Sequence, residues 1–204
     1  MRIKKAIAGV TAAAAALAGG VALAGPAQAT GYKSGKTITE TAVALSGGSK
    51  AGIPDRRSWD FDIAVAALGL TGLDEVLNDR SAKYTVVLPT DGAFIRSANE
   101  LGANVRNEAQ AIEFYVGLGE ETVSNVLLYH VVPGSQSYNK LKRAGDVDTA
   151  LKVLGGVQDA TFDAKRRVIV DQLDRKAFVF VKNLPAQNGK INVIGKVILP
   201  GLPG

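Results

Sequence analysis

Groups that commonly catalyse reactions or bind metals are scarce in this sequence. The chain has one histidine, His130, and no cysteine. A metal site normally brings several histidine, cysteine or carboxylate ligands together, and one histidine with scattered acids does not predict such a site. The sequence also has no G-x-S-x-G nucleophile elbow and no glycine-rich phosphate loop. We therefore expect no catalytic residue, no cofactor and no metal site, and a protein that is not an enzyme.

Two patterns leave other chemistry open. His130 could serve a hydrolase of cell-wall or ester substrates if folding brings a serine and an aspartate beside it. Glycosidase chemistry needs two facing carboxylates, a pair that a sequence cannot place. The acidic pairs Asp60/Asp62 and Asp74/Glu75 look instead like charges at helix starts, where the helix dipole favours them. A hydrolase is therefore the least favoured of the functions that we consider.

The first 29 residues have the order of a secretory signal peptide. Arg2, Lys4 and Lys5 form a positive end, and the run from Ala6 to Gly25 carries no charge. The segment closes on Pro26-Ala27-Gln28-Ala29, which ends in the A-x-A pattern of a cleavage site. We expect cleavage after residue 29 by the general secretory route, and therefore a secreted, extracellular protein.

The charge of the remaining chain is close to balanced. Cleavage removes three of the 24 basic residues and none of the 19 acidic ones, so the net charge falls from +5 to +2. The basic clusters Arg56-Arg57, Lys140–Arg143 and Lys165–Arg167 are short, whereas nucleic-acid binders carry a clustered patch. We expect no nucleic-acid partner, and contact with a charged polysaccharide is a minor alternative. Without cysteine or an apolar tail we also expect no lipid anchor, no membrane span after cleavage, and a released monomer.

Composition divides the rest of the chain into two parts. Residues 30–55 are rich in Gly, Ser, Thr and Lys, with one short apolar stretch at Ala42–Leu45. Such a composition predicts a flexible spacer, of which a part could pack on the domain. Residues 56–202 show no internal repeat and are predicted to form one domain.

Helices are expected mainly in the first half of this domain. The spacing of apolar residues and the capping residues indicate them. The predicted helices are Trp59–Leu70 with Asp60 as its N-cap, Gly72–Leu77 opened by a Thr71/Asp74 capping box, one from Thr90 or Asp91 to Leu101, Glu108–Leu118 capped by Asn107, and Glu121–His130.

Strands are expected mainly in the second half. The predicted strands are Tyr84–Leu88, Thr149–Leu154, Ala160–Phe162, Val168–Leu173, Ala177–Val181, Lys190–Ile194 and Val197–Leu199. Asn188-Gly189 predicts a hairpin turn, because both residues tolerate a positive φ. A helical half followed by a stranded half predicts an α+β fold with the helices packed on a β-sheet wedge. A pocket in this wedge could carry a small apolar ligand, which is a second possible function.

Three segments resemble the conserved blocks of the fasciclin domain family. Tyr84–Phe94 reads YTVVLPTDGAF, similar to the block in which a strand runs into "PT-[DN]-x-AF". Leu128–Gly134 (LYHVVPG) resembles the central Tyr-His block, and Asn188–Pro200 (NGKINVIGKVILP) resembles the closing block. Asp60–Ile63 and the leucines that follow are similar to the opening helices. The resemblance covers about residues 59–200 in the family's order, and it is closest to the secreted single-domain members of bacteria.

The resemblance implies a fasciclin-like α+β fold and an adhesion or interaction module that binds an extracellular protein, matrix or cell-wall polymer. Within its first block, Thr90 or Asp91 would cap the next helix and Phe94 would anchor it. Tyr129 and His130 would be either a buried polar pair that holds the following loop or a recognition element.

In the second half, Asn188 and Gly189 would form the turn that opens the closing block. Asn183 and Leu184 lie where many members carry an Asp-Ile dipeptide linked to integrin recognition. Asn183 removes the carboxylate that integrins bind through a metal ion. Two further departures are Asn192 in place of a common histidine and Gly195 in place of a common aspartate.

Overall fold

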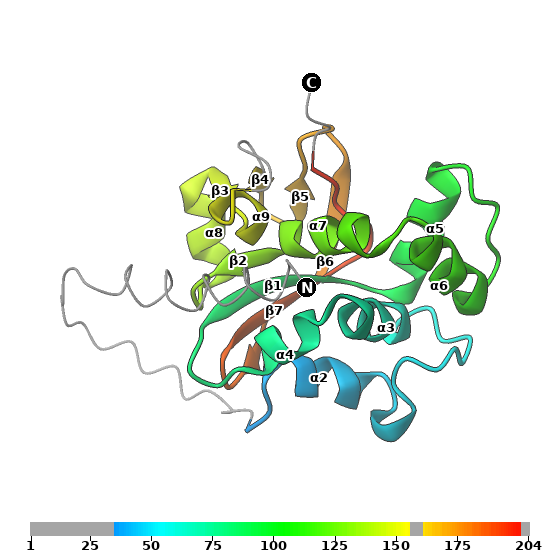
Figure 1. The fold of residues 1–204 in the computed structure, drawn as a ribbon. Coiled ribbons are helices and arrows are strands. Elements are labelled where there is room, and N and C mark those ends of the chain that lie inside the picture. The colour runs from blue at the N-terminus through cyan, green and yellow to red at the C-terminus, as the bar shows by residue number, and fades with distance from the viewer. Residues whose placement is uncertain (1–34, 156–160, 201–204) are drawn as a thin grey trace.

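The residues that the structure describes, 35–155 and 161–200, form an α+β fold in the computed structural model (Figure 1). This confirms the predicted fold class. The helical elements are α2 (Ile38–Leu45), the short 3-10 helix η1 (Gly48–Lys50), α3 (Asp62–Thr71), α4 (Leu73–Asn78), α5 (Asp91–Glu100), α6 (Glu108–Gly117), α7 (Glu120–Tyr129), α8 (Tyr138–Ala144) and α9 (Ala150–Val153). The predicted signal peptide, residues 1–29, lies outside the described residues.

A single sheet joins the first strand of the domain to the last. The strands are β1 (Tyr84–Pro89), β2 (Val131–Pro133), β3 (Asp146–Asp148), β4 (Thr161–Ala164), β5 (Val168–Val170), β6 (Lys176–Ala186) and β7 (Gly189–Ile194). Their order is β2-β1-β7-β6-β5-β4-β3. β1 and β7 pair in parallel, with Val86 opposite Ile191, and the other neighbours are antiparallel.

Alternation along β1 divides the hydrophobic core into two clusters. Val86 and Leu88 pack with residues of α2 to α7, whereas Val87 packs with the cluster under α8, α9 and β3 to β6. This follows from the period of two along a strand. In Figure 1, α2, α3 and α4 lie on one side of β1 and β7, and α8 and α9 lie beside β3, β4 and β5.

Several predicted elements are confirmed within one or two residues. β1, α6 and α7 have the expected positions, and the Asn107 side chain caps α6 by accepting the backbone N–H of Gln110 at 3.0 Å. Two predicted caps are wrong. The residue in the N-cap position of α3 is Phe61, not Asp60, and Thr71 donates its hydroxyl to Ala67 O within α3 and opens no capping box.

Two predicted strands are also wrong. Thr149–Leu154 contains the one-turn helix α9, in which Thr149 takes the N-cap position and Ala150 and Leu151 are buried. Alanine, leucine and lysine are strong helix formers, which the strand prediction underweighted. Val197–Leu199 belongs to no strand of the sheet, and side chains bind its backbone instead.

Residues 35–55 differ from the predicted flexible spacer. Thr37 and Glu40 form a capping box that starts α2, and Ile38 and Ala42 are buried against the domain. The Ile38 N–H also donates to the Asn188 side chain at 2.8 Å. The sequence does contain a helix signal here, because Ile38 and Ala42 are spaced i, i+4 within a segment that begins with a T-x-x-E capping box. The prediction from composition alone did not use it.

The turn before β7 differs from the predicted one. Ala186 pairs with Gly189, so the turn residues are Gln187 and Asn188, and the residues of positive φ do not include Asn188 or Gly189. Gly189 is needed for a different reason, since a Cβ there would lie 1.8 Å from the Tyr84 carbonyl oxygen. The buried Asn188 amide donates to Leu77 O at 2.8 Å and to Asp79 O at 2.9 Å.

Candidate binding surface

The central Tyr-His block is buried at the end of α7. Tyr129 donates its hydroxyl to Thr161 O and accepts the Gln172 N–H at 3.3 Å. Burial raises the Tyr129 pKa above its usual value. The Tyr129 and His130 side chains are both buried, and Tyr129 joins α7 to β4 and to the turn that follows β5.

Both ring nitrogens of His130 bind backbone groups. Nδ1 lies 2.7 Å from Val126 O, and Nε2 lies 3.1 Å from Ile198 N. Because the Ile198 N–H can only donate, Nε2 must accept and Nδ1 carries the proton. Burial lowers the His130 pKa to about 4. With both nitrogens in use, the imidazole has no free atom to activate a nucleophile, so the geometry does not favour the hydrolase alternative.

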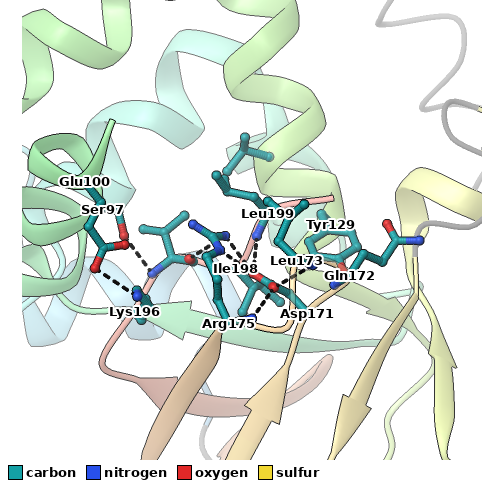
Figure 2. A network of polar contacts seen from close by, with 12 residues as sticks. Ser97, Glu100, Tyr129, Asp171, Gln172, Leu173, Arg175, Lys196, Ile198 and Leu199 are labelled. Carbon is teal, nitrogen blue, oxygen red and sulfur yellow. Dashed lines mark hydrogen bonds and ion pairs between the residues drawn. The ribbon is translucent and has the colours of Figure 1, made fainter. Parts of the chain in front are cut away.

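Buried side chains hold the C-terminal segment Val197–Leu199 in place of a neighbouring strand (Figure 2). Ser97 Oγ accepts the Val197 N–H at 3.3 Å, and Asp171 Oδ2 accepts the Leu199 N–H at 3.0 Å. Asp171 is fully buried and forms an ion pair with Arg175 at 2.6 Å. We call Ser97, His130, Asp171 and Arg175, together with the segment they hold, the C-terminal clamp.

Asn183 and Leu184 lie in an irregular stretch of β6. The register with β7 shifts between Val181 and Leu184, and Asn183 adopts φ 56°. Asparagine tolerates this left-handed conformation better than most residues. The Asn183 side chain accepts the Tyr138 N–H at 2.6 Å at the start of α8. Leu184 is half-buried against the core.

Two departures from the family pattern are directly bonded to each other. The Asn183 N–H donates to the Asn192 side chain at 3.0 Å, and Asn192 is fully buried. Asn183 stands where many members have an acid, and Asn192 where many have a histidine. The side-chain oxygen of Asn192 thus supports the irregular backbone of β6 at Asn183.

The remaining predicted structural residues occupy the start of α5. Thr90 is in the N-cap position without a side-chain capping bond, and the Asp91 carboxylate caps α3 instead by accepting the Asp62 and Ile63 N–H groups. Phe94 is buried and meets Tyr115 edge to face, with ring centroids 5.3 Å apart.

Three aromatic side chains cluster on the solvent side of β6. Trp59, Phe178 and Phe180 are 71%, 44% and 36% exposed. The Trp59 and Phe180 ring centroids are 5.2 Å apart, and those of Phe178 and Phe180 are 5.4 Å apart. Ala177 and Val179 alternate with the two phenylalanines and point into the core. Large aromatic groups grouped in this way commonly mark interaction sites.

Gly195 makes room for this cluster. A Cβ at Gly195 would lie 2.7 Å from Cε2 and Cζ of Phe180, and its φ is not positive. A larger residue here would therefore push the Phe180 ring aside, whereas the backbone conformation itself does not call for glycine. An aspartate, common at this position in the family, would displace the ring.

Basic side chains lie beside the aromatic cluster. The Arg167 guanidinium lies over the Phe178 ring, 5.2 Å from its centroid. Lys165, Arg166, Arg167 and Lys176 line an open hollow of about 490 Å³ together with two valines of β5. Lys165 forms an ion pair with Asp163 at 3.2 Å. We call the three aromatic and four basic residues the aromatic–basic surface.

The fasciclin domain family matches residues 60–200 of this chain. The chain belongs to the fasciclin domain family. In structure it is similar to a domain pair from the insect cell adhesion molecule fasciclin I, with a TM-score of 0.56 at 13% identity. The match covers 81% of this chain and 51% of that one, so this chain spans about half the length of the insect structure. A search of curated proteins gave no match.

As a member of this family, the chain belongs to a general class of adhesion or interaction modules. No helix within residues 35–155 and 161–200 is both long and apolar enough to cross a bilayer. Two apolar cavities against the helices have volumes of about 20 and 10 Å³. A cavity of this size holds at most a water molecule, so neither supports the carrier alternative.

Proposed function

We propose that this fasciclin domain is a secreted adhesion module that binds an acidic extracellular polymer through its aromatic–basic surface. The observation that carries the proposal is the exposed Trp59, Phe178 and Phe180 cluster with Arg167 over one of its rings. The predicted signal peptide, residues 1–29, supports an extracellular location.

The chemistry of this surface favours an acidic partner. Guanidinium groups bind carboxylate, phosphate and sulfate groups with two parallel hydrogen bonds, and aromatic faces bind flat or apolar groups at low entropic cost. One hollow is lined by Lys165 and by three further cationic groups, those of Arg166, Arg167 and Lys176. They lie just before β5 and at the start of β6. The charge is local, because the mature chain is near neutral overall.

The shape of the surface favours an extended chain over a small molecule. The hollow beside β5 and β6 is open to solvent, unlike the enclosed sites that bury most of a small ligand. An acidic polymer can lie along β6, with its sugar or backbone groups against the rings and its acidic groups toward the cations. A protein with an acidic face is the competing partner, and the experiment below separates the two.

Binding of residues 30–204 to polygalacturonate and heparin, with neutral dextran as a control, tests the proposal by titration calorimetry. We expect binding to both acidic polymers, none to dextran, and a loss of affinity with added salt because the contact is ionic. Arg167→Ala should weaken binding about tenfold. Arg106→Ala, at an exposed arginine in the α5–α6 loop outside the surface, should leave it unchanged.

Equal losses for the two arginine variants would contradict the proposal. If neither polymer binds, and a pull-down of secreted material instead retains an acidic protein that Arg167→Ala releases, the surface is a protein-binding site and the polymer is wrong.

A further inference from the structure

Three buried carboxylates from two distant segments meet at the start of α3. Asp60 and Asp62 lie at that helix start, and Asp91 begins α5. One carboxylate oxygen of each lies within 4.8 Å of the other two. The three residues are 7%, 1% and 0% exposed. The fold therefore brings Asp91 beside two acids from which two helices and one strand, α3, α4 and β1, separate it in the sequence.

Hydrogen bonds explain the place of Asp91 but not that of its neighbours. Asp91 Oδ2 and Oδ1 accept the Asp62 and Ile63 N–H groups at 3.0 and 2.9 Å and so cap α3. Asp62 Oδ1 accepts the Gly52 N–H at 2.7 Å. Both oxygens of Asp60 and Oδ2 of Asp62 have no hydrogen-bond partner among the described residues. At least one of the two unpartnered Asp60 oxygens lies within the carboxylate cluster.

No basic side chain neutralises the cluster. None of the ion pairs within the described ranges involves Asp60, Asp62 or Asp91. The cluster therefore has no positive partner among the described residues. Buried carboxylates without a counter-charge are strongly unfavourable.

The surroundings add more negative charge. Asp60 is also within 4.8 Å of carboxylate oxygens of Asp55 and Glu108. The Glu108 carboxylate accepts the Asp55 and Arg56 N–H groups at 2.6 and 3.0 Å. Arg57 pairs with Asp55 at 3.3 Å and is largely exposed. Arg57 therefore pairs with the outermost acid, Asp55, and forms no ion pair with the buried acids among the described residues.

We propose that Asp60, Asp62 and Asp91 form a binding site for a Ca²⁺ ion. Carboxylate oxygens without histidine or cysteine suit a hard cation. Ca²⁺ binds oxygens at about 2.3–2.6 Å, so two ligands on opposite sides lie about 4.6–5.2 Å apart. The three carboxylates lie close enough to share one such ion, since one oxygen of each is within 4.8 Å of the other two. Mg²⁺ is usually held by one or two carboxylates together with water, so a set of three protein carboxylates favours Ca²⁺.

A bound ion would join three pieces of the fold. Asp60 follows the exposed Trp59, Asp62 starts α3, and Asp91 lies within the block Tyr84–Phe94. The Asp91 N–H donates to Asp60 O at 3.0 Å, so the two segments already touch through their backbones. The site stands on these contacts alone and does not depend on the aromatic–basic surface.

Thermal unfolding of residues 30–204 in EDTA and in 10 mM CaCl2 tests the site. We expect Ca²⁺ to raise the melting temperature by about 3–10 °C, the shift for dissociation constants of about 0.1–1 mM. MgCl2 should give a smaller shift. Tb³⁺, a Ca²⁺ substitute, should show emission on excitation of Trp59, the only tryptophan of the chain, and Ca²⁺ should displace it.

Asp60→Asn is the decisive variant because it removes the charge of one proposed ligand and keeps the size of its side chain. It should abolish the Ca²⁺ shift and the Tb³⁺ emission, and in EDTA it should be at least as stable as the parent. Asp148→Asn, at an exposed acid of β3, should keep both responses. The same Ca²⁺ shift in Asp60→Asn, or no shift and no heat of binding in the parent, would overturn the site. Protons shared between the carboxylates would then be what neutralises the cluster.

Discussion

The C-terminal clamp and the aromatic–basic surface both involve β5, β6 and the segments beside them. The charged groups of the clamp are largely buried, whereas the aromatic and basic groups of the surface are exposed. In the clamp, Asp171 is fully buried, pairs with Arg175 and accepts three backbone N–H groups. At the surface, Arg167 stands over the half-exposed Phe178. Tyr129 and His130 of the central block are likewise buried, whereas the three aromatic side chains of the aromatic–basic surface are exposed to solvent.

The largest effect is expected inside the clamp. Asp171→Ala leaves Arg175 without its counter-ion and three N–H groups without an acceptor, so the free energy of unfolding should fall by about 3–5 kcal/mol. Urea unfolding measures the change. Asp148→Ala breaks the exposed pair with Lys152 and should cost less than about 1 kcal/mol. Similar losses for both variants would mean that burial does not distinguish the clamp.

The clamp should also make stability depend on pH through His130. Its pKa is lowered from 6.5 to about 4 in the folded state, so the unfolded chain takes up the proton first as the pH falls. The contribution of neutral His130 to the free energy of unfolding is complete above about pH 6.5. It falls by about 3 kcal/mol as the pH approaches 4. Urea unfolding of the parent and His130→Gln at pH 7 and 4.5 isolates this dependence. Parallel pH curves for the two proteins would show that His130 does not titrate in this way.

A change at Gly195 should act on the surface without reaching the clamp. Gly195→Asp puts a Cβ against the Phe180 ring, so the ring must move away from Trp59. We expect a red shift of Trp59 fluorescence and a loss of about 1 kcal/mol in stability, since the half-exposed ring can rotate outward. Gly117→Ala, where a Cβ would meet nothing within 4 Å and φ is not positive, is the control for a glycine lost elsewhere. An unchanged Trp59 spectrum in Gly195→Asp would show that the ring does not depend on this glycine.

The smallest effect on stability is expected at Phe178. Its ring is 44% exposed, so Phe178→Ala should change the free energy of unfolding by less than about 1 kcal/mol. Urea unfolding checks this, with Phe94→Ala as the buried counterpart that should cost about 3–5 kcal/mol. A large loss at Phe178 would make it a core residue and remove it from the surface.

Local signals in the sequence predicted much of the fold. Asn107 sits directly before an apolar helix and caps it, and Tyr84–Pro89 is a compact strand ended by proline. The prediction failed where a distant group decides the outcome. Asp91 caps α3 from 29 residues away, and no local pattern around Asp60 shows this.

The candidate surface was missed for a similar reason. Phe178 and Phe180 alternate with Ala177 and Val179, a pattern that shows two faces but not which face meets solvent when both are apolar. Trp59 joins them from a segment more than a hundred residues earlier. Gly195 carried the clearest available signal, because the departure from the family's common aspartate marks the place where Phe180 approaches the backbone.

The most direct test of the function is the affinity of Trp59→Ala/Phe178→Ala for polygalacturonate, measured by titration calorimetry beside the parent and Tyr129→Phe. The double variant should stay folded and bind at least tenfold more weakly, because two aromatic contacts of about 1 kcal/mol or more are lost. Tyr129→Phe removes only a buried hydroxyl and should bind as the parent does. Unchanged affinity in the double variant, or a selective loss in a folded Tyr129→Phe, would contradict the aromatic–basic surface as the binding site.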